Sequence, residues 1–308
     1  MTKRLFIFAG YDKDCIADET LLHYLNSLSE LGDIIVVMDN NLPDTEITKI
    51  KSIKNILSVI ATRHDEYDFG SYKRGFQFAQ EKNLLNKYDW FYFANDSVYG
   101  PLFNIKNILE DLESRGKDLT GLTDYTALRT PVHVQSWFVG ISRRIANEQF
   151  FADFLNSVQH ENSKILVISK YEVRLSQLIL RHGYEMSTFI DGQDGEICHC
   201  MYKKPILMIK NGVPFVKKNA LDAVNGLHFL LPCTTDELVN KIHNHAVRNR
   251  LPMMGDITYK KIFKLMLFGA PLFAIYRQKP QNALWRSYKI CLFDKIPVIK
   301  ISTNKDEN

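Results

Sequence analysis

The chain has 308 residues, of which 45% are hydrophobic and 24% charged. This composition is typical of a globular protein with a full-sized core, and it excludes a disordered or fibrous chain. The net charge of +4 hides an asymmetry, because residues 241–308 carry 13 Lys and Arg against 4 Asp and Glu, whereas residues 1–240 carry 26 against 31. A basic tail of this kind predicts a polyanionic partner, either a membrane or a nucleic acid.

The N-terminal residues and the cysteines indicate a cytoplasmic protein. The apolar run Leu5–Ala9 is too short for a secretory signal and lacks a small-residue cleavage site. The five cysteines are odd in number and scattered, which predicts reduced thiols. Cys198, His199 and Cys200 have the composition of a metal cluster, but no second pair follows at zinc-site spacing, so we do not predict a zinc site.

The first hundred residues alternate between buried strands and amphipathic helices. Short apolar runs predict the strands, and apolar residues at helical spacing predict the helices. The strands are expected at 5–9, 33–38, 58–61 and 90–94, and the helices at 20–31, 47–57 and 72–82. This order predicts an α/β fold with a mainly parallel sheet flanked by helices.

The second half of the chain continues this pattern and then changes character. Helices are expected at 105–115, 144–158 and 171–181, and strands at 119–123, 134–141, 205–209 and 213–216. Residues 259–276 are apolar and aromatic, carry flanking lysines, and fall short of the roughly 20 residues that span a bilayer. We expect a basic helix there, which either lies in a membrane interface or packs on the rest of the chain. We therefore divide the chain into an α/β domain, 1–235, and a basic, mainly helical region, 236–308.

Polar side chains follow three of the predicted strands, in the segments Gly10–Asp12, Asp39–Asn40 and Asn95–Ser97. The carboxyl ends of parallel strands meet at one edge of a sheet, where open α/β folds bind ligands. Asp39 could accept hydrogen bonds from a base or ribose, and Asp96 could bind Mg²⁺ or Mn²⁺. The alternative is that Asp96 only caps a turn.

Two predicted helix starts carry residues suited to chemistry. Gly70 and Ser71 could open a helix whose free amides attract phosphate. Lys73 and Arg74 would then add positive charge where the helix dipole disfavours it, which points to an anionic ligand; the alternative is a solvated helix start. Glu172 at the next helix start either stabilises the dipole or, if it faces the sheet edge, acts as a general base.

Four segments taken together resemble the rhamnan synthesis protein F family, bacterial glycosyltransferases of cell-surface polysaccharide assembly. They run in order along the chain as Tyr67–Lys73, Asn95–Pro101, His133–Phe138 and Asn211–Lys217. The resemblance implies the single-domain nucleotide-sugar fold called GT-A, a dTDP-, UDP- or GDP-sugar donor, a polysaccharide or lipid-linked glycan acceptor, and inversion at the sugar. From the cysteines and the basic tail we expect the protein in the cytoplasm or on the inner face of the cytoplasmic membrane.

The resemblance assigns a role to each matching residue. Glu172 would be the catalytic carboxylate, and Asp96 would hold Mg²⁺ or Mn²⁺. The acidic motif of many such enzymes has two carboxylates, whereas here Asn95 precedes Asp96, so the ion would bind weakly or only together with the diphosphate. The donor would be bound by Gly10, Asp39, Asp68, Gly70, Lys73, Asn95 and Asp96, and the sugar or acceptor by His133, Gln135 and Ser136.

Three other functions compete with a sugar transferase. A nucleotidyltransferase would carry a Gly-rich, basic signature near the first strand, and none is present. A nucleic-acid-binding protein is disfavoured because the basic tail contains no recognisable reading motif. A non-catalytic glycan-binding or scaffolding subunit stays open, because Asn95 replaces a second carboxylate. The donor sugar does not follow from any residue, and only the family's name suggests rhamnose.

Overall fold

The computed structural model of this chain describes residues 2–127, 130–191, 200–224, 230, 232–251, 259–267, 270–278, 285–292 and 296–304. Cys198 and His199, the first two members of the cluster considered above, lie outside the described residues.

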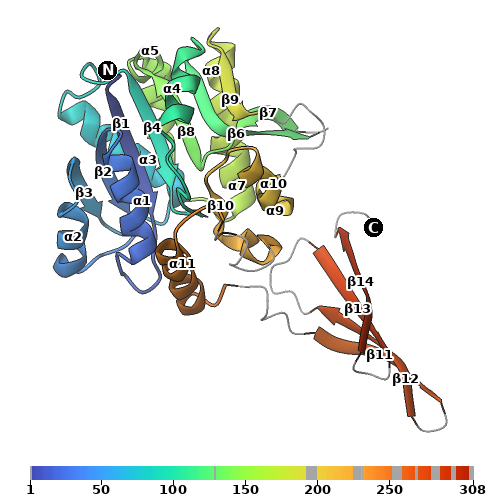
Figure 1. The fold of residues 1–308 in the computed structure, drawn as a ribbon. Helices are drawn as coiled ribbons and strands as arrows, with labels where there is room; N and C mark the ends of the chain where they lie inside the picture. Colours follow the sequence, from blue (N-terminus) through green and yellow to red (C-terminus); the bar gives the residue numbers. More distant parts are fainter. Residues whose placement is uncertain are drawn as a thin grey trace.

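An eight-stranded sheet forms the centre of the molecule (Figure 1). Seven strands follow the order β3-β2-β1-β4-β8-β6-β7, and β9 pairs with β6. Strands β1 to β4 are parallel to one another, whereas β8 runs antiparallel to β4 and β6. The strands are β1 (Arg4–Gly10), β2 (Asp33–Met38), β3 (Ile56–Ala61), β4 (Trp90–Asn95), β6 (Leu119–Ala127), β7 (Thr130–Val134), β8 (Phe138–Ser142) and β9 (Met186–Ile190). The predicted α/β fold with a mainly parallel sheet is confirmed.

Helices cover both faces of this sheet because the side chains of its central strands alternate between two cores. Phe6 and Phe8 of β1 pack with α1 and α4, while Leu5 and Ile7 pack with α3 and α6. Burial of such side chains stabilises the fold by about 1.5–3 kcal/mol each. The helices are α1 (Glu19–Ser29), α2 (Asp44–Lys51), α3 (Tyr67–Glu81), α4 (Lys106–Ser114), α5 (Arg143–Ala146), α6 (Gln149–Asn156), α7 (Lys164–Val167), a π-helical segment (Ile168–Val173) and α8 (Arg174–Arg181).

Two predicted strands have a different structure. The strand expected at 134–141 is divided between two strands, β7 and β8. Both pair with β6, and the residues between them turn the chain and interrupt the pairing. The strand expected at 205–209 is the helix α10 (Pro205–Lys210), which begins at a proline. Proline suits the first helical position, since its missing amide would have no partner there and its backbone angle is already helical.

Beyond β9 the chain returns to the carboxyl end of β4. It passes through α9 (Cys200–Lys203) and α10 and then forms β10 (Val216–Lys217), which is followed by a 3-10 helix (Lys218–Val224). Strand β10 pairs antiparallel with β5 (Val98–Tyr99), which places Lys217 opposite Val98. This pairing brings residues that are 120 positions apart to one side of the Asn95–Ser97 turn.

The region 236–308 is not mainly helical, and the predicted helix over 259–276 is wrong. Helix α11 (Asp236–Arg248) packs against α1 and so belongs with the eight-stranded sheet and its helices, which we call the first body. The remaining described residues form an antiparallel sheet in the order β11-β12-β13-β14 (Figure 1). Its strands are β11 (Tyr259–Leu267), β12 (Ala270–Gln278), β13 (Trp285–Leu292) and β14 (Ile296–Asn304). Short apolar runs do not by themselves distinguish helix from strand, and aromatic and β-branched residues favour strands.

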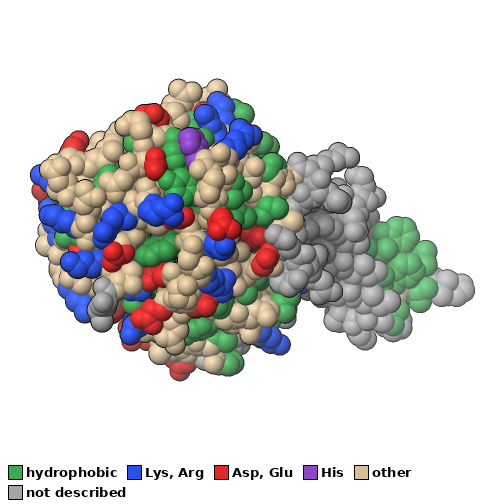
Figure 2. All heavy atoms as spheres, turned by 90° about the horizontal axis from the view of Figure 1, so that it is seen from above, with side chains coloured by type: hydrophobic (Ala, Val, Ile, Leu, Met, Phe, Trp, Pro, Cys, Tyr) green, Lys and Arg blue, Asp and Glu red, His purple; other side chains and the backbone are tan. Residues whose placement is uncertain are grey.

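The charge asymmetry of the chain concerns residues 241–308, most of which lie in this C-terminal part. On the face of the first body shown in Figure 2, Lys and Arg side chains are interspersed with Asp and Glu. By the sequence count, the excess of positive charge belongs to residues 241–308. Among the residues that the structure describes, no helix is long and apolar enough to cross a membrane.

Candidate active site

A cavity of about 440 Å³ opens beside the carboxyl ends of β1, β2 and β4. Strand β1 lies between β2 and β4, so the chain leaves β1 toward one side of the sheet and later returns on the other. Such a switch point is where open α/β sheets bind ligands. Five predicted donor-binding residues line the cavity: Gly10, Asp39, Asp68, Asn95 and Asp96. Its lining also includes four residues to which the sequence assigned no role: Tyr11, Arg63, His160 and Lys164.

One side of the cavity is suited to a flat ring. The Arg63 guanidinium lies 5.0 Å from the centroid of the Tyr11 ring, and this ring is half-exposed. Asp39 lies beside them, where its Oδ1 accepts hydrogen bonds from the amides of His64, at 2.7 Å, and Asp65, at 3.0 Å. These amides fix the orientation of the Asp39 carboxylate at the cavity. The ring, the guanidinium and the carboxylate together offer stacking and hydrogen bonding to a nucleoside.

The turn after β4 is held by its own side chains. Asn95 Nδ2 donates to Asp68 Oδ2 at 3.0 Å, while Asn95 Oδ1 accepts from the amide and the hydroxyl of Ser97 at 3.1 and 2.5 Å. Asp96 Oδ2 accepts from the amide of Tyr11 at 3.3 Å and lies 3.5 Å from Lys218 Nζ. The carboxylate of Asp96 is thus already paired with a cation.

Ser136 links Asp68, which lines the cavity, to Glu172, which is not among the lining residues. Its hydroxyl donates to Glu172 Oε2 and lies 3.4 Å from Asp68 Oδ2, and its amide donates to Glu172 Oε2 at 3.2 Å. His133 Nε2 lies 3.3 Å from Glu172 Oε1 on the other side. Of the predicted cleft residues, Gln135 is directed elsewhere, because its side-chain oxygen accepts from Thr123 Oγ1 at 2.7 Å.

The two linked carboxyls differ in acidity. Burial, and then the charge of Glu172, raise the pKa of Asp68 from its ordinary 3.8 to about 6. Burial also raises the pKa of Glu172, but hydrogen bonds from His133 and Ser136 outweigh it and hold this pKa below its usual value. Neighbouring carboxyls with perturbed and separated pKa values are typical of catalytic sites.

Glu172 does not start a helix, contrary to the sequence-based expectation. It lies in the π-helical segment between α7 and α8, within one helical stretch that begins at Lys164. Stabilisation of a helix dipole therefore does not explain this residue. Short π-helical segments are rare and occur frequently at functional sites.

The expected phosphate-binding helix start at Gly70 is also wrong. Helix α3 begins at Tyr67, and the Gly70 amide donates to the carbonyl of Glu66 inside the helix. A Cβ at Gly70 would lie 2.2 Å from the Cβ of Glu66, so glycine is needed here for close packing. Lys73 Nζ lies 2.7 Å from Glu66 Oε2 and donates to the carbonyl of Val158, which turns its charge away from the cavity lining.

Lys217 is a site residue to which the sequence assigned no role. It is 5% exposed, and its Nζ donates to Ser97 Oγ at 2.8 Å. The rings of Trp137 and Tyr202 lie 5.3 and 5.7 Å from this ammonium. Burial lowers the pKa of Lys217 to about 7. Only the pairing of β10 with β5 reveals that this lysine is buried beside the turn after β4.

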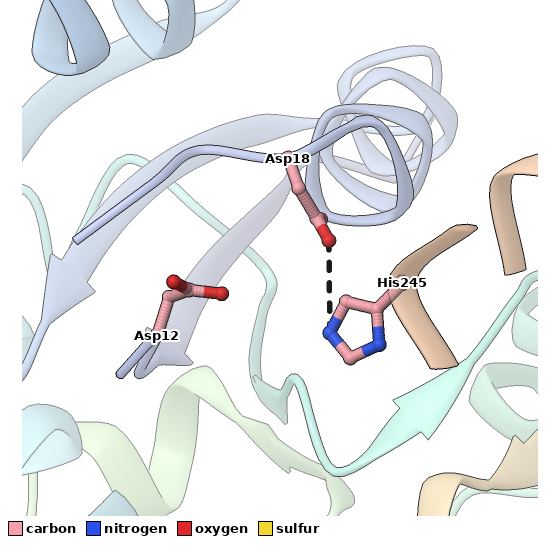
Figure 3. Close-up of side chains that lie close together, drawn as sticks. All are labelled: Asp12, Asp18 and His245. Carbon is pink, nitrogen blue, oxygen red and sulfur yellow. Dashed lines mark ion pairs between the residues drawn. The ribbon is translucent and has the colours of Figure 1, made fainter. Parts of the chain in front are cut away.

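A second acidic cluster brings the connection after β1 to α11. The possible ligand atoms of Asp12, Asp18 and His245 all lie within 4.8 Å of one another (Figure 3). Arg248 already binds this cluster, because its guanidinium donates to Asp12 at 2.8 and 2.5 Å and to Asp18 at 3.1 Å. Burial lowers the pKa of His245 to about 4, so its imidazole is neutral at pH 7. The cluster is therefore an ionic clasp that holds α11, and a metal ion would have to displace Arg248.

Asp96 is already paired with an ammonium, which disfavours an added divalent cation. Mg²⁺ is usually bound by one or two carboxylates together with substrate phosphates. Within the described residues the one grouping of three or more acidic, His or Cys ligands is the cluster held by Arg248, so a cation at Asp96 would depend on the diphosphate for most of its ligands. Asp96 faces Lys218 at 3.5 Å, and Lys217 contacts the next residue of the turn. The ammonium of Lys218 and the protonated fraction of Lys217, whose pKa is about 7, would repel an added cation.

Comparisons with known proteins place the chain in a family. A family model described as RgpF, rhamnan synthesis protein F, matches residues 34–267. Virulence protein VirA of Vibrio anguillarum is 27% identical over 192 residues, which cover 60% of this chain and 59% of that protein. The uncharacterized protein y4gN of Sinorhizobium fredii is 20% identical over 179 residues, 57% of this chain and 46% of that protein. The chain thus spans about half the length of these relatives.

Solved structures that resemble the chain include a glycosyltransferase. The apo form of GlyE from Streptococcus pneumoniae TIGR4 superposes with a TM-score of 0.43 and 11% sequence identity. The match covers 85% of this chain and 67% of that one.

Proposed function

We propose that this chain, which belongs to the rhamnan synthesis protein F family, is a glycosyltransferase that moves a sugar from a nucleotide diphosphate to a growing polysaccharide or lipid-linked glycan. One observation carries the proposal. The switch-point cavity offers a stacking surface at Tyr11 and Arg63 and reaches the linked carboxyls of Asp68 and Glu172 through Ser136. A nucleotide sugar presents the matching groups: a flat base at one end, a diphosphate, and a sugar whose anomeric carbon needs a nearby base.

The donor would lie along the carboxyl edge of the sheet. Its base would stack at Tyr11 and Arg63, and its ribose would face Asp39, an acceptor suited to hydroxyl groups. The diphosphate would then reach the Asp96–Ser97 turn, near Lys164 of the cavity lining. In this placement the sugar extends toward Asp68.

The reaction would be a direct displacement at the anomeric carbon. The acceptor hydroxyl oxygen forms the new bond, the bond from the anomeric carbon to the phosphate oxygen breaks, and the nucleoside diphosphate leaves with the electron pair. Glu172 takes the hydroxyl proton, and attack from the face opposite the leaving group inverts the configuration. His133 and Ser136 hold the carboxylate of Glu172 ionised, since their hydrogen bonds keep its pKa low.

Asp68 is a second candidate for the base, and a specific observation favours it. Asp68 lines the cavity, and its pKa of about 6 is better matched to proton transfer near neutrality than that of Glu172. The pH dependence of kcat/KM distinguishes Asp68 from Glu172, because its acid limb reports the pKa of the catalytic base. An acid limb near pH 6 in kcat/KM would assign the base to Asp68, whereas an acid limb below pH 4.5 would assign it to Glu172.

The experiment that tests the function is donor turnover. Purified protein is incubated with dTDP-, UDP- and GDP-sugars, and release of nucleoside diphosphate is measured with and without glycan acceptors. We expect slow hydrolysis of one donor, lost in a Glu172→Gln, Asp68→Asn double variant that still folds. A wild-type protein that binds glycans but neither binds nor hydrolyses any donor would instead be the scaffolding subunit considered above.

A further inference from the structure

We propose that Lys217, assisted by Lys218, is the built-in cation that binds the donor's diphosphate, in place of a divalent metal ion. The inference rests on the proposed function and deepens it. It concerns how the negative charge of the leaving group is neutralised, and it assigns this task to residues that were given no role by the sequence.

The burial of Lys217 is the first step. A buried ammonium is costly unless an anion compensates it. Within the part of the chain that the structure describes, Lys217 has no direct ion pair with a carboxylate, although Glu172, Asp68 and Asp96 lie near enough to favour its charge. Two aromatic rings and the Ser97 hydroxyl supply partial compensation. Such a lysine is poised for an anion that arrives from outside.

The position of Lys217 is the second step. Ser97, which lines the cavity, accepts a hydrogen bond from Lys217 Nζ and donates one to Asn95 Oδ1. Asn95 in turn donates to Asp68. The ammonium thus stands at one end of a continuous chain of hydrogen bonds, and the carboxyl that faces the sugar stands further along it. A diphosphate bound at Ser97 would lie between the two.

The state of Asp96 is the third step. Its carboxylate, the strand-end acid that would hold a metal ion, is 3.5 Å from Lys218 Nζ. Lys218 follows Lys217 directly, and its amide donates to the carbonyl of Ser97 at 3.0 Å. The backbone pairing therefore fixes both ammonium groups beside the turn. A bound diphosphate raises the pKa of Lys217, and the two ammonium groups then supply the two positive charges that a divalent ion would bring.

The chemical consequence concerns the leaving group. When the bond from the anomeric carbon breaks, its electron pair remains on a diphosphate oxygen, and negative charge grows there. A fixed ammonium stabilises this charge without reorganisation, and no proton has to move because the nucleoside diphosphate leaves as an anion.

Isothermal titration of dTDP, UDP and GDP, in EDTA and in MnCl₂, tests the assignment. Wild type is compared with Lys217→Met and with Lys210→Met, which removes an exposed lysine of the same segment. We expect one diphosphate to bind wild type in EDTA, and Lys217→Met to weaken this binding about tenfold to a hundredfold. Lys210→Met should bind as wild type does, and the corresponding nucleoside monophosphate should bind Lys217→Met with much less loss.

The folding of the variant is checked by thermal unfolding without ligand. Lys217→Met should unfold no earlier than wild type, because a buried charge is replaced by an apolar side chain of similar length. Binding that requires Mn²⁺, or equal diphosphate affinity of wild type and Lys217→Met, would overturn the inference and leave the transferase proposal standing. Failure of every nucleotide to bind wild type in both buffers would refute both.

Discussion

Replacing Asp68 by Asn should change the stability of the protein with a sign that depends on pH. Burial and the charge of Glu172 raise the pKa of Asp68 from 3.8 to about 6 in the folded state. A carboxyl whose pKa is higher in the folded than in the unfolded protein favours folding while it is protonated. This contribution is fully present below the unfolded pKa and is lost as pH rises through the folded pKa. Ionised Asp68 therefore costs up to about 3 kcal/mol above pH 7, at about 1.4 kcal/mol for each unit of pKa.

The substitution removes this cost but also weakens the hydrogen bonding. Asp68 Oδ2 accepts from Asn95 and lies near the Ser136 hydroxyl, while its Oδ1 accepts from the amide of Phe69 at 3.1 Å. An asparagine has one acceptor oxygen and cannot serve donors on both sides. One lost hydrogen bond costs about 1 kcal/mol. Asp68→Asn should thus be more stable than wild type by about 2 kcal/mol at pH 8, or about 4–8 °C in Tm, and less stable by up to about 1 kcal/mol near pH 4.

Thermal unfolding across pH 4 to 8 measures this difference. Asp65→Asn is the matched control, because it makes the same substitution at an exposed carboxylate of the same cavity. The reasoning is refuted if the Tm difference between Asp68→Asn and wild type stays constant over this range, or if Asp65→Asn reproduces its pH dependence.

Three further predictions follow from the site and its surroundings. Lys218→Met should free Asp96, so that Mn²⁺ raises the Tm of the nucleotide-bound variant more than that of wild type; an equal response would mean that the ion pair does not block a cation. Arg248→Met should lower Tm by several degrees, since it leaves Asp12 and Asp18 uncompensated, and Mn²⁺ or Zn²⁺ should restore part of the loss by binding between Asp12, Asp18 and His245 in place of the guanidinium. The basic β11–β14 region should carry the protein onto anionic vesicles at low salt, and Phe263→Ser, at a side chain 47% exposed, should weaken sedimentation; equal sedimentation of wild type with neutral vesicles would argue against this reading.

The sequence determined the frame of the fold and the edge at which the site lies. Strands β1, β2 and β4 are buried on both faces, so each is a continuous apolar run that ends where polar residues begin. Three such runs separated by helical periodicity imply parallel strands, and parallel strands bring their carboxyl ends together. Asp39 and Asp96 could therefore be placed at the cavity from local pattern.

The partners of the site residues needed the tertiary structure. The hydrogen bond of Ser136 with Glu172 and that of Lys217 with Ser97 join residues that are 36 and 120 positions apart. The ion pair of Lys73 with Glu66 is local, but it forms because helix α3 begins at Tyr67 and not at Gly70. From the sequence alone Lys217 is expected to be exposed to solvent, and only the pairing of β10 with β5 shows that it is buried. The helix expected at 259–276 failed for a related reason, because a short apolar run gives the same signal in either structure. Local periodicity reports which face is buried, whereas charge pairing and acidity depend on distances through space, and only the folded chain fixes those distances.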